Sequence, residues 1–470
     1  MYFEQIPTPG LGCFSYAVGC PLAGVMAVVD PRRDTKVYLR IAKEYGMRIT
    51  HIFDTHVHAD HISGAQQLSA ETGADIYIHE SAPVNYKAEK VKSGDEFRFG
   101  NASIRILHTP GHTPNSISLL ISDIVRSPGA EMILTGDLLF VGDIGRPDLP
   151  GEEILEEQIQ NLYDSLHKTL GPLPDYLEVY PAHGQGSLCG GSMSAKPFST
   201  LGYERLTNPM LQILDFSEFK QTILSNLPTR PLSFSGIIAG NMNKVAVIPP
   251  CEDLAKYALT TDETDEFRKQ GVTLLDLRDG LSFSAAHIPG SIHVDASSGT
   301  MLNWIGVAIP PNSPLLLILP SDKSFEEIQL ELQRIGYDRI KGWLEGGLHG
   351  WIAEGREIRR LPHVSALEIK TRLEGSTPPV LIDVRTLKEF KEMHITGAIH
   401  LPFERILELN ACPDILLNKE TIVICRSGFR SSIAASLLMA RGCTNLNVLS
   451  GGMSAWEQLS KFVPTLKRWK

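Results

Sequence analysis

Features that mark membrane, secreted and nucleic-acid-binding proteins are scarce in this sequence. The longest apolar runs, such as residues 315–319, are far shorter than the roughly 20 residues that cross a bilayer. Residues 1–5 contain no basic stretch and no long apolar core, so we expect no signal peptide. Lysine and arginine number 44 against 54 acidic residues. The net charge of −10 argues against nucleic acid as a main partner, because phosphate binding requires a basic surface.

Cysteine is also scarce, with seven residues in a chain of 470. An odd number of cysteines spread over so long a chain does not resemble a disulfide framework and favours a reducing compartment. We therefore expect a cytoplasmic protein that does not contact a membrane. A chain of 470 residues can bury a large core and should divide into about two to four domains.

Side chains that bind metal ions are concentrated in four short segments of the first half of the chain, each at the end of an apolar run. The first segment, residues 55–61, reads THVHADH. Imidazole and carboxylate groups are ligands of zinc and iron in proteins. A single HxH pair is weak evidence, but HxHxDH followed by three further ligand-bearing segments predicts a metal site. The candidate ligands are His56, His58, Asp60, His61, His112, Asp137 and His183.

These motifs resemble the metallo-β-lactamase superfamily, and the resemblance covers about the first half of the chain. Alternating strand and helix patterns between residues 25 and 180 indicate by themselves only a mixed α/β domain. The resemblance implies more, namely a four-layered αββα sandwich with its metal site at the ends of strands. We expect this domain to span residues 1–248.

The remainder of the chain contains an internal repeat. The motif LDLR at residues 275–278 returns as IDVR at residues 382–385, which is 107 positions later, and HIPG at residues 287–290 returns as HITG with the same shift. The later segments GGLHGW and GGMSAW also match. The sequence therefore predicts two α/β domains of one kind behind the metal domain, at residues 251–358 and 363–470.

The second repeat carries a cysteine at a position suited to nucleophilic chemistry. An apolar strand pattern at residues 421–424 leads directly into Cys425 and the loop CRSGFR, and a helix pattern follows. Backbone N–H groups at a helix start and the positive charges of Arg426 and Arg430 favour the thiolate. The loop and its flanking motifs resemble the rhodanese family of sulfurtransferases. The resemblance implies that Cys425 accepts a sulfane sulfur as a persulfide and passes it to a thiol.

The first repeat lacks this nucleophile. Leu319 occupies the position of Cys425, since each lies 17 residues before a matching glycine. Pro320 removes a backbone donor from the loop, and the charge of Asp322 would repel an anion. We therefore interpret residues 251–358 as a rhodanese-like domain without catalytic activity.

Two features narrow the chemistry of the metal domain. Residues 145–148 read GRPD and resemble the GRxD element of the persulfide dioxygenase and glyoxalase II branch of the superfamily. The rhodanese-like neighbour handles sulfane sulfur, which a persulfide-oxidising enzyme would share with it. The resemblance implies iron-dependent oxidation of thiol persulfides to sulfite with O₂, coupled to sulfur transfer that yields thiosulfate, and hence sulfide detoxification. The partners would be a low-molecular-weight thiol persulfide and O₂, with the protein a homo-oligomer (dimer or tetramer).

The same resemblance implies roles for individual residues. A single Fe²⁺ ion per chain would be held by His56, His112 and Asp137. Arg146 would hold the anionic part of the thiol carrier. Cys189, in a glycine-rich loop, either faces the site and receives sulfur or has no role. The other candidate ligands would orient the iron ligands or bind a second metal; these are His58, Asp60, His61 and His183.

Two other functions remain open. A thioester hydrolase similar to glyoxalase II would use the same residues to bind two metal ions, such as two zinc ions. A non-catalytic sulfur-relay carrier would bind metal and persulfide without turning over oxygen or thioester. Metal content and oxygen dependence separate these functions from that of a dioxygenase.

Overall fold

The computed structural model describes residues 1–127, 129–187, 189–191, 193–227, 230–248 and 253–462. Its contacts divide the chain into two compact units. The first comprises Met1–Pro250 together with Leu330–Gly336, and the second comprises Cys251–Gln329 and Tyr337–Lys470. The expected boundary near residues 249–250 lies outside the described residues. None of the described helices has the length and apolarity of a membrane span.

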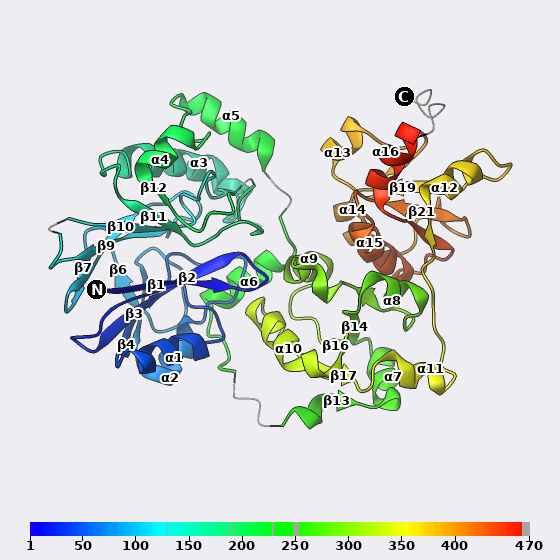
Figure 1. Cartoon of the computed structure of the whole chain (residues 1–470), viewed down its shortest axis with the longest axis horizontal. Coiled ribbons are helices and arrows are strands. Elements are labelled where there is room, and N and C mark those ends of the chain that lie inside the picture. The colour runs from blue at the N-terminus through cyan, green and yellow to red at the C-terminus, as the bar shows by residue number, and fades with distance from the viewer. Residues whose placement is uncertain (128, 188, 192, 228–229, 249–252, 463–470) are drawn as a thin grey trace. The chain divides into compact units, whose positions relative to one another are not determined.

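The first unit contains two six-stranded β-sheets (Figure 1). One sheet has its strands in chain order, β1-β2-β3-β4-β5-β6, and the other has the order β12-β11-β10-β9-β8-β7. The first sheet consists of β1 (Tyr2–Thr8), β2 (Cys13–Cys20), β3 (Val25–Val29), β4 (Arg48–Phe53), β5 (Asp75–His79) and β6 (Glu89–Val91). The second consists of β7 (Glu96–Phe99), β8 (Ala102–His108), β9 (Ile117–Asp123), β10 (Met132–Gly136), β11 (Glu178–Pro181) and β12 (Ser199–Thr200).

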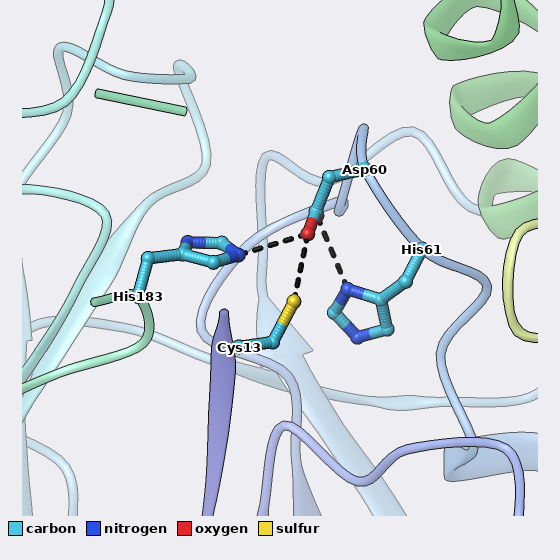
Figure 2. A group of neighbouring side chains, drawn as sticks. All are labelled: Cys13, Asp60, His61 and His183. Atoms are coloured by element: carbon cyan, nitrogen blue, oxygen red, sulfur yellow. Dashed lines mark hydrogen bonds and ion pairs between the residues drawn. The ribbon is translucent and has the colours of Figure 1, made fainter. Parts of the chain in front are cut away.

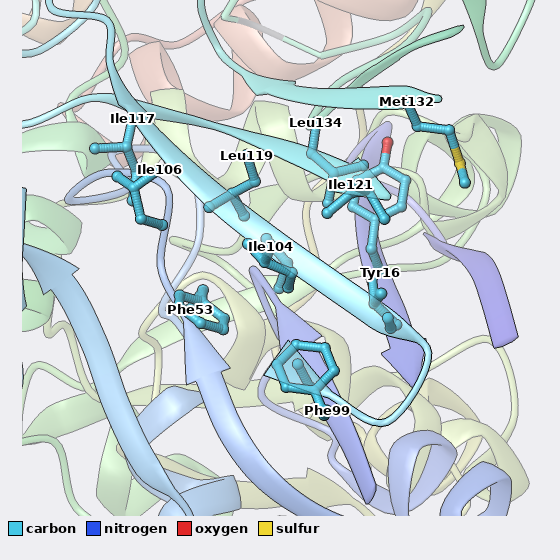
Figure 3. Packing of buried hydrophobic residues seen from close by; sticks show 14 of the residues in the cluster. Tyr16, Phe53, Phe99, Ile104, Ile106, Ile117, Leu119, Ile121, Met132 and Leu134 are labelled. Atoms are coloured by element: carbon cyan, nitrogen blue, oxygen red, sulfur yellow. The ribbon is translucent and has the colours of Figure 1, made fainter. Parts of the chain in front are cut away.

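The facing sides of the two sheets form the core of this unit (Figure 3). Phe53 from β4 packs in one cluster with Phe99, Ile104 and Leu119 from β7, β8 and β9. Successive side chains of β9 point to opposite faces of its sheet, so this strand contributes to two layers of the core. Leu119 faces the core between the sheets, whereas Leu120 packs on the opposite face against helices.

Helices cover the outer face of each sheet. Tyr38 of α1 and Leu68 of α2 pack against the first sheet, and Ile159 and Leu162 of α3 pack against the second. This order of layers confirms the αββα sandwich that the sequence predicted. The helical elements of the unit are α1 (Lys36–Glu44), α2 (Ala65–Thr72), η1 (Glu152–Ile154), α3 (Leu155–Asp164), η2 (Ser165–Thr169), α4 (Leu201–Thr207), α5 (Phe216–Asn226) and α6 (Ser233–Met242).

The second unit contains two five-stranded sheets of identical topology, β13-β17-β16-β14-β15 and β18-β22-β21-β19-β20. All registered strand pairs in both sheets are parallel. This confirms the predicted pair of rhodanese-like α/β domains. The strands are β13 (Ala258–Leu259), β14 (Thr273–Asp276), β15 (Ile292–His293), β16 (Leu315–Ile318), β17 (Ile340–Leu344), β18 (His363–Val364), β19 (Val380–Asp383), β20 (Ile399–His400), β21 (Thr421–Ile424) and β22 (Leu446–Leu449).

Helices alternate with these strands along the chain, as parallel connections require. In the first repeat they are η3 (Leu254–Tyr257), α7 (Thr261–Lys269), α8 (Gly280–Ala285), η4 (Ala296–Ser298), α9 (Met301–Ala308), η5 (Asp322–Ser324), α10 (Phe325–Arg334) and α11 (Leu348–Ala353). In the second they are α12 (Ala366–Leu373), α13 (Leu387–Glu392), α14 (Phe403–Leu407), α15 (Phe429–Ala440) and α16 (Gly452–Phe462).

One disulfide joins Cys412, in the segment after α14, to Cys443, in the turn after α15. The odd number of widely spread cysteines led us to expect reduced thiols, and this pair corrects that expectation. The two residues meet because the N–H group of Cys412 donates to the carbonyl oxygen of Arg441. The free cysteines among the described residues are Cys13, Cys20, Cys189 and Cys425.

Candidate metal centre and cysteine loop

The sequence-predicted metal ligands lie where strands of the first unit end. The THVHADH segment follows β4, Asp137 follows β10, and His183 lies two residues beyond β11. His112 lies four residues beyond β8. The segments that contain Gly136 and Thr55 lie close together here: a Cβ atom on Gly136 would be 2.9 Å from Thr55 Oγ1. Gly136 also has a φ of 53°, which glycine adopts without strain.

Three of these residues point unpaired ligand atoms toward one another. His56 Nε2 lies 3.8 Å and His112 Nε2 lies 3.2 Å from Asp137 Oδ2. Ligand atoms of the three residues lie within 4.8 Å of one another, and each residue is at most 1% exposed. Within the described part of the chain, none of the three atoms has a hydrogen-bond partner. Unpaired buried polar atoms are costly, so this donor set fits a bound metal ion.

The remaining ring nitrogens determine which tautomer each histidine adopts. His112 Nδ1 must donate, because its partner at 2.8 Å is the carbonyl oxygen of Arg146. The Thr55 hydroxyl donates to Asp30 Oδ2, so at 2.9 Å it accepts from His56 Nδ1. Both histidines therefore present the lone pair of Nε2 to the centre of the site.

The electrostatics of the site agree with this arrangement. Burial lowers the pKa of His56 and of His112, which keeps both rings neutral. Burial alone would raise the pKa of Asp137, but His183 and His112 outweigh it, and the pKa of this carboxyl falls below its usual value. Two neutral imidazoles and one carboxylate are the protonation states that a metal ion requires.

A second group of ligand-type residues surrounds Asp60 (Figure 2). Asp60 Oδ2 pairs with His183 Nε2 at 2.8 Å and with the Cys13 thiol at 3.0 Å, while Oδ1 pairs with His61 Nδ1 at 3.1 Å. His183 Nδ1 in turn lies 2.6 Å from Asp137 Oδ1. Burial would lower the pKa of His183, but the two carboxylates raise it, so the ring donates on both sides. Hydrogen bonds within this group thus engage atoms that could bind a second metal.

Cys13 was missed by sequence reasoning. It lies in β2, outside every ligand motif, and pairs in an isolated bridge with His183. Burial raises the pKa of its thiol, so Cys13 is a neutral S–H donor toward Asp60. No local pattern in the sequence indicates this position.

His58 forms its ring hydrogen bond with Asp30, although its ring lies beside that of His61, with centroids 4.4 Å apart. His58 Nε2 lies 3.0 Å from Asp30 Oδ1, and Asp30 also accepts from the backbone and hydroxyl of Thr55. Burial would lower the pKa of His58, but Asp30 raises it to about 9. Its Nδ1 is buried without a hydrogen bond among the described residues, and no ring nitrogen of His58 lies within 4.8 Å of all three atoms of the His56 group.

The GRPD motif supports the ligands through its backbone. A Cβ atom on Gly145 would lie 1.8 Å from the carbonyl oxygen of Asp137, so only glycine allows this contact. The next carbonyl, that of Arg146, accepts from His112. The Arg146 guanidinium is buried and forms two hydrogen bonds of 2.7 Å with Asp148. Contact with a thiol carrier therefore stays a prediction for this side chain.

Cys189 lies beside the metal-ligand residues. Its sulfur is within 4.8 Å of ligand atoms of Asp137 and His183, and the residue is 1% exposed. Burial raises the pKa of its thiol well above the usual value. A neutral, buried thiol is a poor nucleophile, so receipt of sulfur by Cys189 stays a prediction.

Cys425 lies between β21 and α15, as the sequence predicted. The N–H group of Gly428 donates to its sulfur at 3.1 Å, and Gly428 has a φ of 102° that favours glycine. Arg430 forms hydrogen bonds of 2.8 and 2.7 Å to the carboxylate of Glu389. Arg426 is exposed and pairs with Glu457. The loop therefore presents a backbone donor to the sulfur, with Arg430 fixed beside it.

The corresponding loop of the first repeat has no thiol. Leu319 follows β16, the strand equivalent to β21 in the sheet order, and is buried. Asp322 accepts a hydrogen bond of 2.9 Å from the N–H group of Gly346. An acidic side chain thus occupies the loop that holds the Cys425 sulfur in the second repeat.

Two family models match the chain: the rhodanese-like domain at residues 260–354 and 365–459, and the metallo-beta-lactamase superfamily at residues 27–183. A solved metallo-beta-lactamase from Staphylococcus aureus subsp. aureus COL is 32% identical, with a TM-score of 0.65, and the match covers 73% of this chain and 98% of that one. Persulfide dioxygenase ETHE1 of Homo sapiens is 29% identical over 242 residues, 51% of this chain and 87% of the relative. A hydroxyacylglutathione hydrolase of Nitrosococcus oceani is 32% identical over 173 residues, 36% of this chain and 61% of the relative.

Proposed function

The chain belongs to the metallo-β-lactamase superfamily and carries two rhodanese-like domains, and from this premise we propose that it is a persulfide dioxygenase with sulfurtransferase activity. Residues 1–248 would oxidise a thiol persulfide to sulfite with O₂. Residues 363–470 would transfer sulfane sulfur through Cys425, and residues 251–358 would lack that activity. The similarity to a persulfide dioxygenase supports this proposal, because it spans a length close to that of the metal domain.

One observation carries the proposal for the metal domain. His56, His112 and Asp137 have unpaired buried ligand atoms, whereas Asp60 and His183 are engaged in hydrogen bonds. Two imidazoles and one carboxylate are the ligand set of non-haem iron(II), which supplies oxygen chemistry when bound. We therefore assign one Fe²⁺ per chain to the first group and an orienting role to the second.

The protein's own residues keep these ligands in place. The protonated ring of His183 holds Asp137 Oδ1, which leaves Oδ2 for the metal. The Arg146 carbonyl and the Thr55 hydroxyl fix His112 and His56. Because every group is buried, water has little access to compete for these hydrogen bonds.

Sulfur transfer would use the loop of Cys425. The Cys425 thiolate attacks the outer sulfur of a persulfide, the S–S bond of the donor breaks, and the carrier leaves as a thiolate. Sulfite then takes the outer sulfur from Cys425, which gives thiosulfate and restores the thiolate. The Gly428 N–H group stabilises the anionic sulfur, and Arg430 adds positive charge.

A hydrolase remains the second candidate function. The residues Cys13, Asp60, His61 and His183 offer atoms within 4.8 Å of one another, which could hold a second metal if their hydrogen bonds were exchanged for it. The similarity to a hydroxyacylglutathione hydrolase agrees with that candidate. A third candidate, a non-catalytic sulfur-relay carrier, predicts persulfide binding without turnover.

Oxygen uptake with glutathione persulfide, combined with metal analysis of protein purified without air, tests the proposal. We expect about one iron per chain, oxygen-dependent formation of sulfite or thiosulfate, and no thioester cleavage under nitrogen. Two metals per chain with oxygen-independent thioester cleavage would establish the hydrolase instead. The low-molecular-weight thiol carrier, the homo-oligomeric state and the cytoplasmic location belong to the same proposal.

A further inference from the structure

A segment of the first rhodanese-like repeat belongs structurally to the metal domain. Residues Leu330–Gly336 form one compact unit with Met1–Pro250, although the sequence places them in the repeat that lacks a nucleophile. The segment contains the last turn of α10 and the residues that follow it. It therefore contributes to the surroundings of the metal-ligand segments.

Arg334 is the main anchor of this segment. Its guanidinium donates two hydrogen bonds to Asp34, of 2.9 and 3.0 Å, and one of 3.4 Å to the carbonyl oxygen of Pro9. Asp34 also forms an ion pair of 3.0 Å with Arg32. Arg334 is only 6% exposed, so its charge depends on this buried pairing.

The end of α10 provides carbonyl groups that a helix leaves without internal partners. The carbonyl oxygen of Gln333 accepts a hydrogen bond of 2.9 Å from Arg33, which also donates to Ala246. The carbonyl oxygen of Arg334 accepts one of 2.7 Å from the N–H group of Ile62. The negative end of the helix dipole favours both donors, and the cation of Arg33 in particular.

The contact with Ile62 links this helix end to the metal ligands. Ile62 directly follows His61, the last histidine of the HxHxDH motif. Asn241 of α6 holds the residues that precede Ile62, because its side chain donates to the carbonyl oxygens of His58 and His61. The ligand loop is thus held by α6 and, at Ile62, by the carbonyl group of Arg334.

We propose that Arg334 is a positioning residue for the metal centre. Residues 330–336 support the metal-binding loop of the same compact unit through this side chain and the adjoining helix end. The inference rests on the proposed function only in naming iron as the bound ion. Independently of the metal's identity, the segment at residues 55–62 should become less ordered when the pairing of Arg334 with Asp34 is lost.

Hydrogen exchange and iron binding of the full chain test this role. In Arg334→Ala, the Ile62 amide should exchange faster, since its acceptor is no longer anchored. Ferrous iron, titrated without air against a coloured chelator, should bind about 10- to 100-fold more weakly, as expected when a group that orients metal ligands is lost. The control Arg339→Ala, an exposed arginine of the same repeat bonded to the carbonyl of Asn312, should match the wild type in both measurements.

A second variant separates this role from unfolding of the repeat. Asp34→Asn removes the negative charge and one of the two acceptor oxygens that hold Arg334, without changing the repeat, and it should also produce faster exchange at Ile62. All five tryptophans lie beyond residue 300, so their fluorescence reports whether the rhodanese-like domains stay folded. If both variants keep wild-type exchange at Ile62 and wild-type iron affinity, Arg334 does not position the centre. If the wild type binds iron without oxygen uptake while the variants lose affinity, the proposed function fails and this inference stands.

Discussion

Asp60→Asn most sharply separates one bound metal from two. In the wild type, Asp60 Oδ2 pairs with His183 and with the Cys13 thiol, and Oδ1 pairs with His61. Asparagine keeps the size of the side chain, but it loses the negative charge and replaces one acceptor oxygen with an N–H₂ donor. One side of this hydrogen-bond group must therefore lose its acceptor.

The effect on a single iron ion would be indirect. Asp137 and Asp60 together raise the pKa of His183, so loss of one carboxylate weakens the protonated ring that donates to Asp137 Oδ1. Loss of a group that orients a metal ligand weakens metal binding by about 10- to 100-fold. This corresponds to roughly 1.4 to 2.8 kcal/mol at 25 °C. Asp60→Asn should still bind one iron, and excess iron should restore much of its oxygen uptake.

Anaerobic iron titration, metal analysis and an oxygen electrode measure these quantities in one preparation. Asp137→Ala provides the contrast, because it removes a ligand oxygen itself and should abolish oxygen uptake at every iron concentration. A dinuclear hydrolase behaves differently, since Asp60 is then a ligand. Two metals in the wild type, one in Asp60→Asn, and thioester cleavage under nitrogen would refute the reasoning for a single iron.

Three further outcomes follow from the second rhodanese-like repeat. Cys425→Ser should abolish cyanide-dependent sulfur transfer but leave persulfide-dependent oxygen uptake, with sulfite replacing thiosulfate as the product; loss of both activities would contradict separate sites. Arg430 lowers the pKa of Glu389 to about 2. This carboxylate therefore stabilises the fold above its ordinary pKa of 4.5 and ceases to do so as the pH falls through about 2. Acid denaturation followed by fluorescence should show a smaller loss of stability over this range in Glu389→Gln than in the wild type. Reduction of the Cys412–Cys443 disulfide should lower the stability of this domain by about 2–5 kcal/mol in a denaturant titration, and an unchanged midpoint would contradict its contribution.

The sequence predicted the convergence of the candidate metal ligands because the fold leaves little choice. His56, His112 and Asp137 each follow a strand, and resemblance to a known family implied that these strands share one sandwich. That the ligand atoms of these three residues are buried without hydrogen-bond partners is visible only in the structure. The position of Cys425 could also be predicted, since a strand, a cysteine, a glycine and a helix follow one another in the chain.

The residues that complete the site could not be predicted from the sequence in this way. Asp30 directly follows β3 in a left-handed conformation with a φ of 49°, and it orients both Thr55 and His58. Aspartate tolerates that conformation, but one aspartate after a strand has no distinguishing pattern. Cys13 is similar, because a small apolar residue within an apolar strand indicates only burial. Both roles depend on contacts across the sandwich.

Arg334 shows why local patterns can conceal a long-range role. In the sequence it is a basic residue in the last turn of an amphipathic helix, a place where arginine compensates the helix dipole at the surface. In the structure it is buried and pairs with Asp34, which lies 300 positions earlier. A surface arginine could be replaced at little cost, whereas loss of the buried Arg334 leaves Asp34 with Arg32 as its remaining ion-pair partner. Leu319 stands where the second repeat has Cys425, whereas Arg334 is the residue for which we propose a positioning role, which is why its removal should be detectable at Ile62.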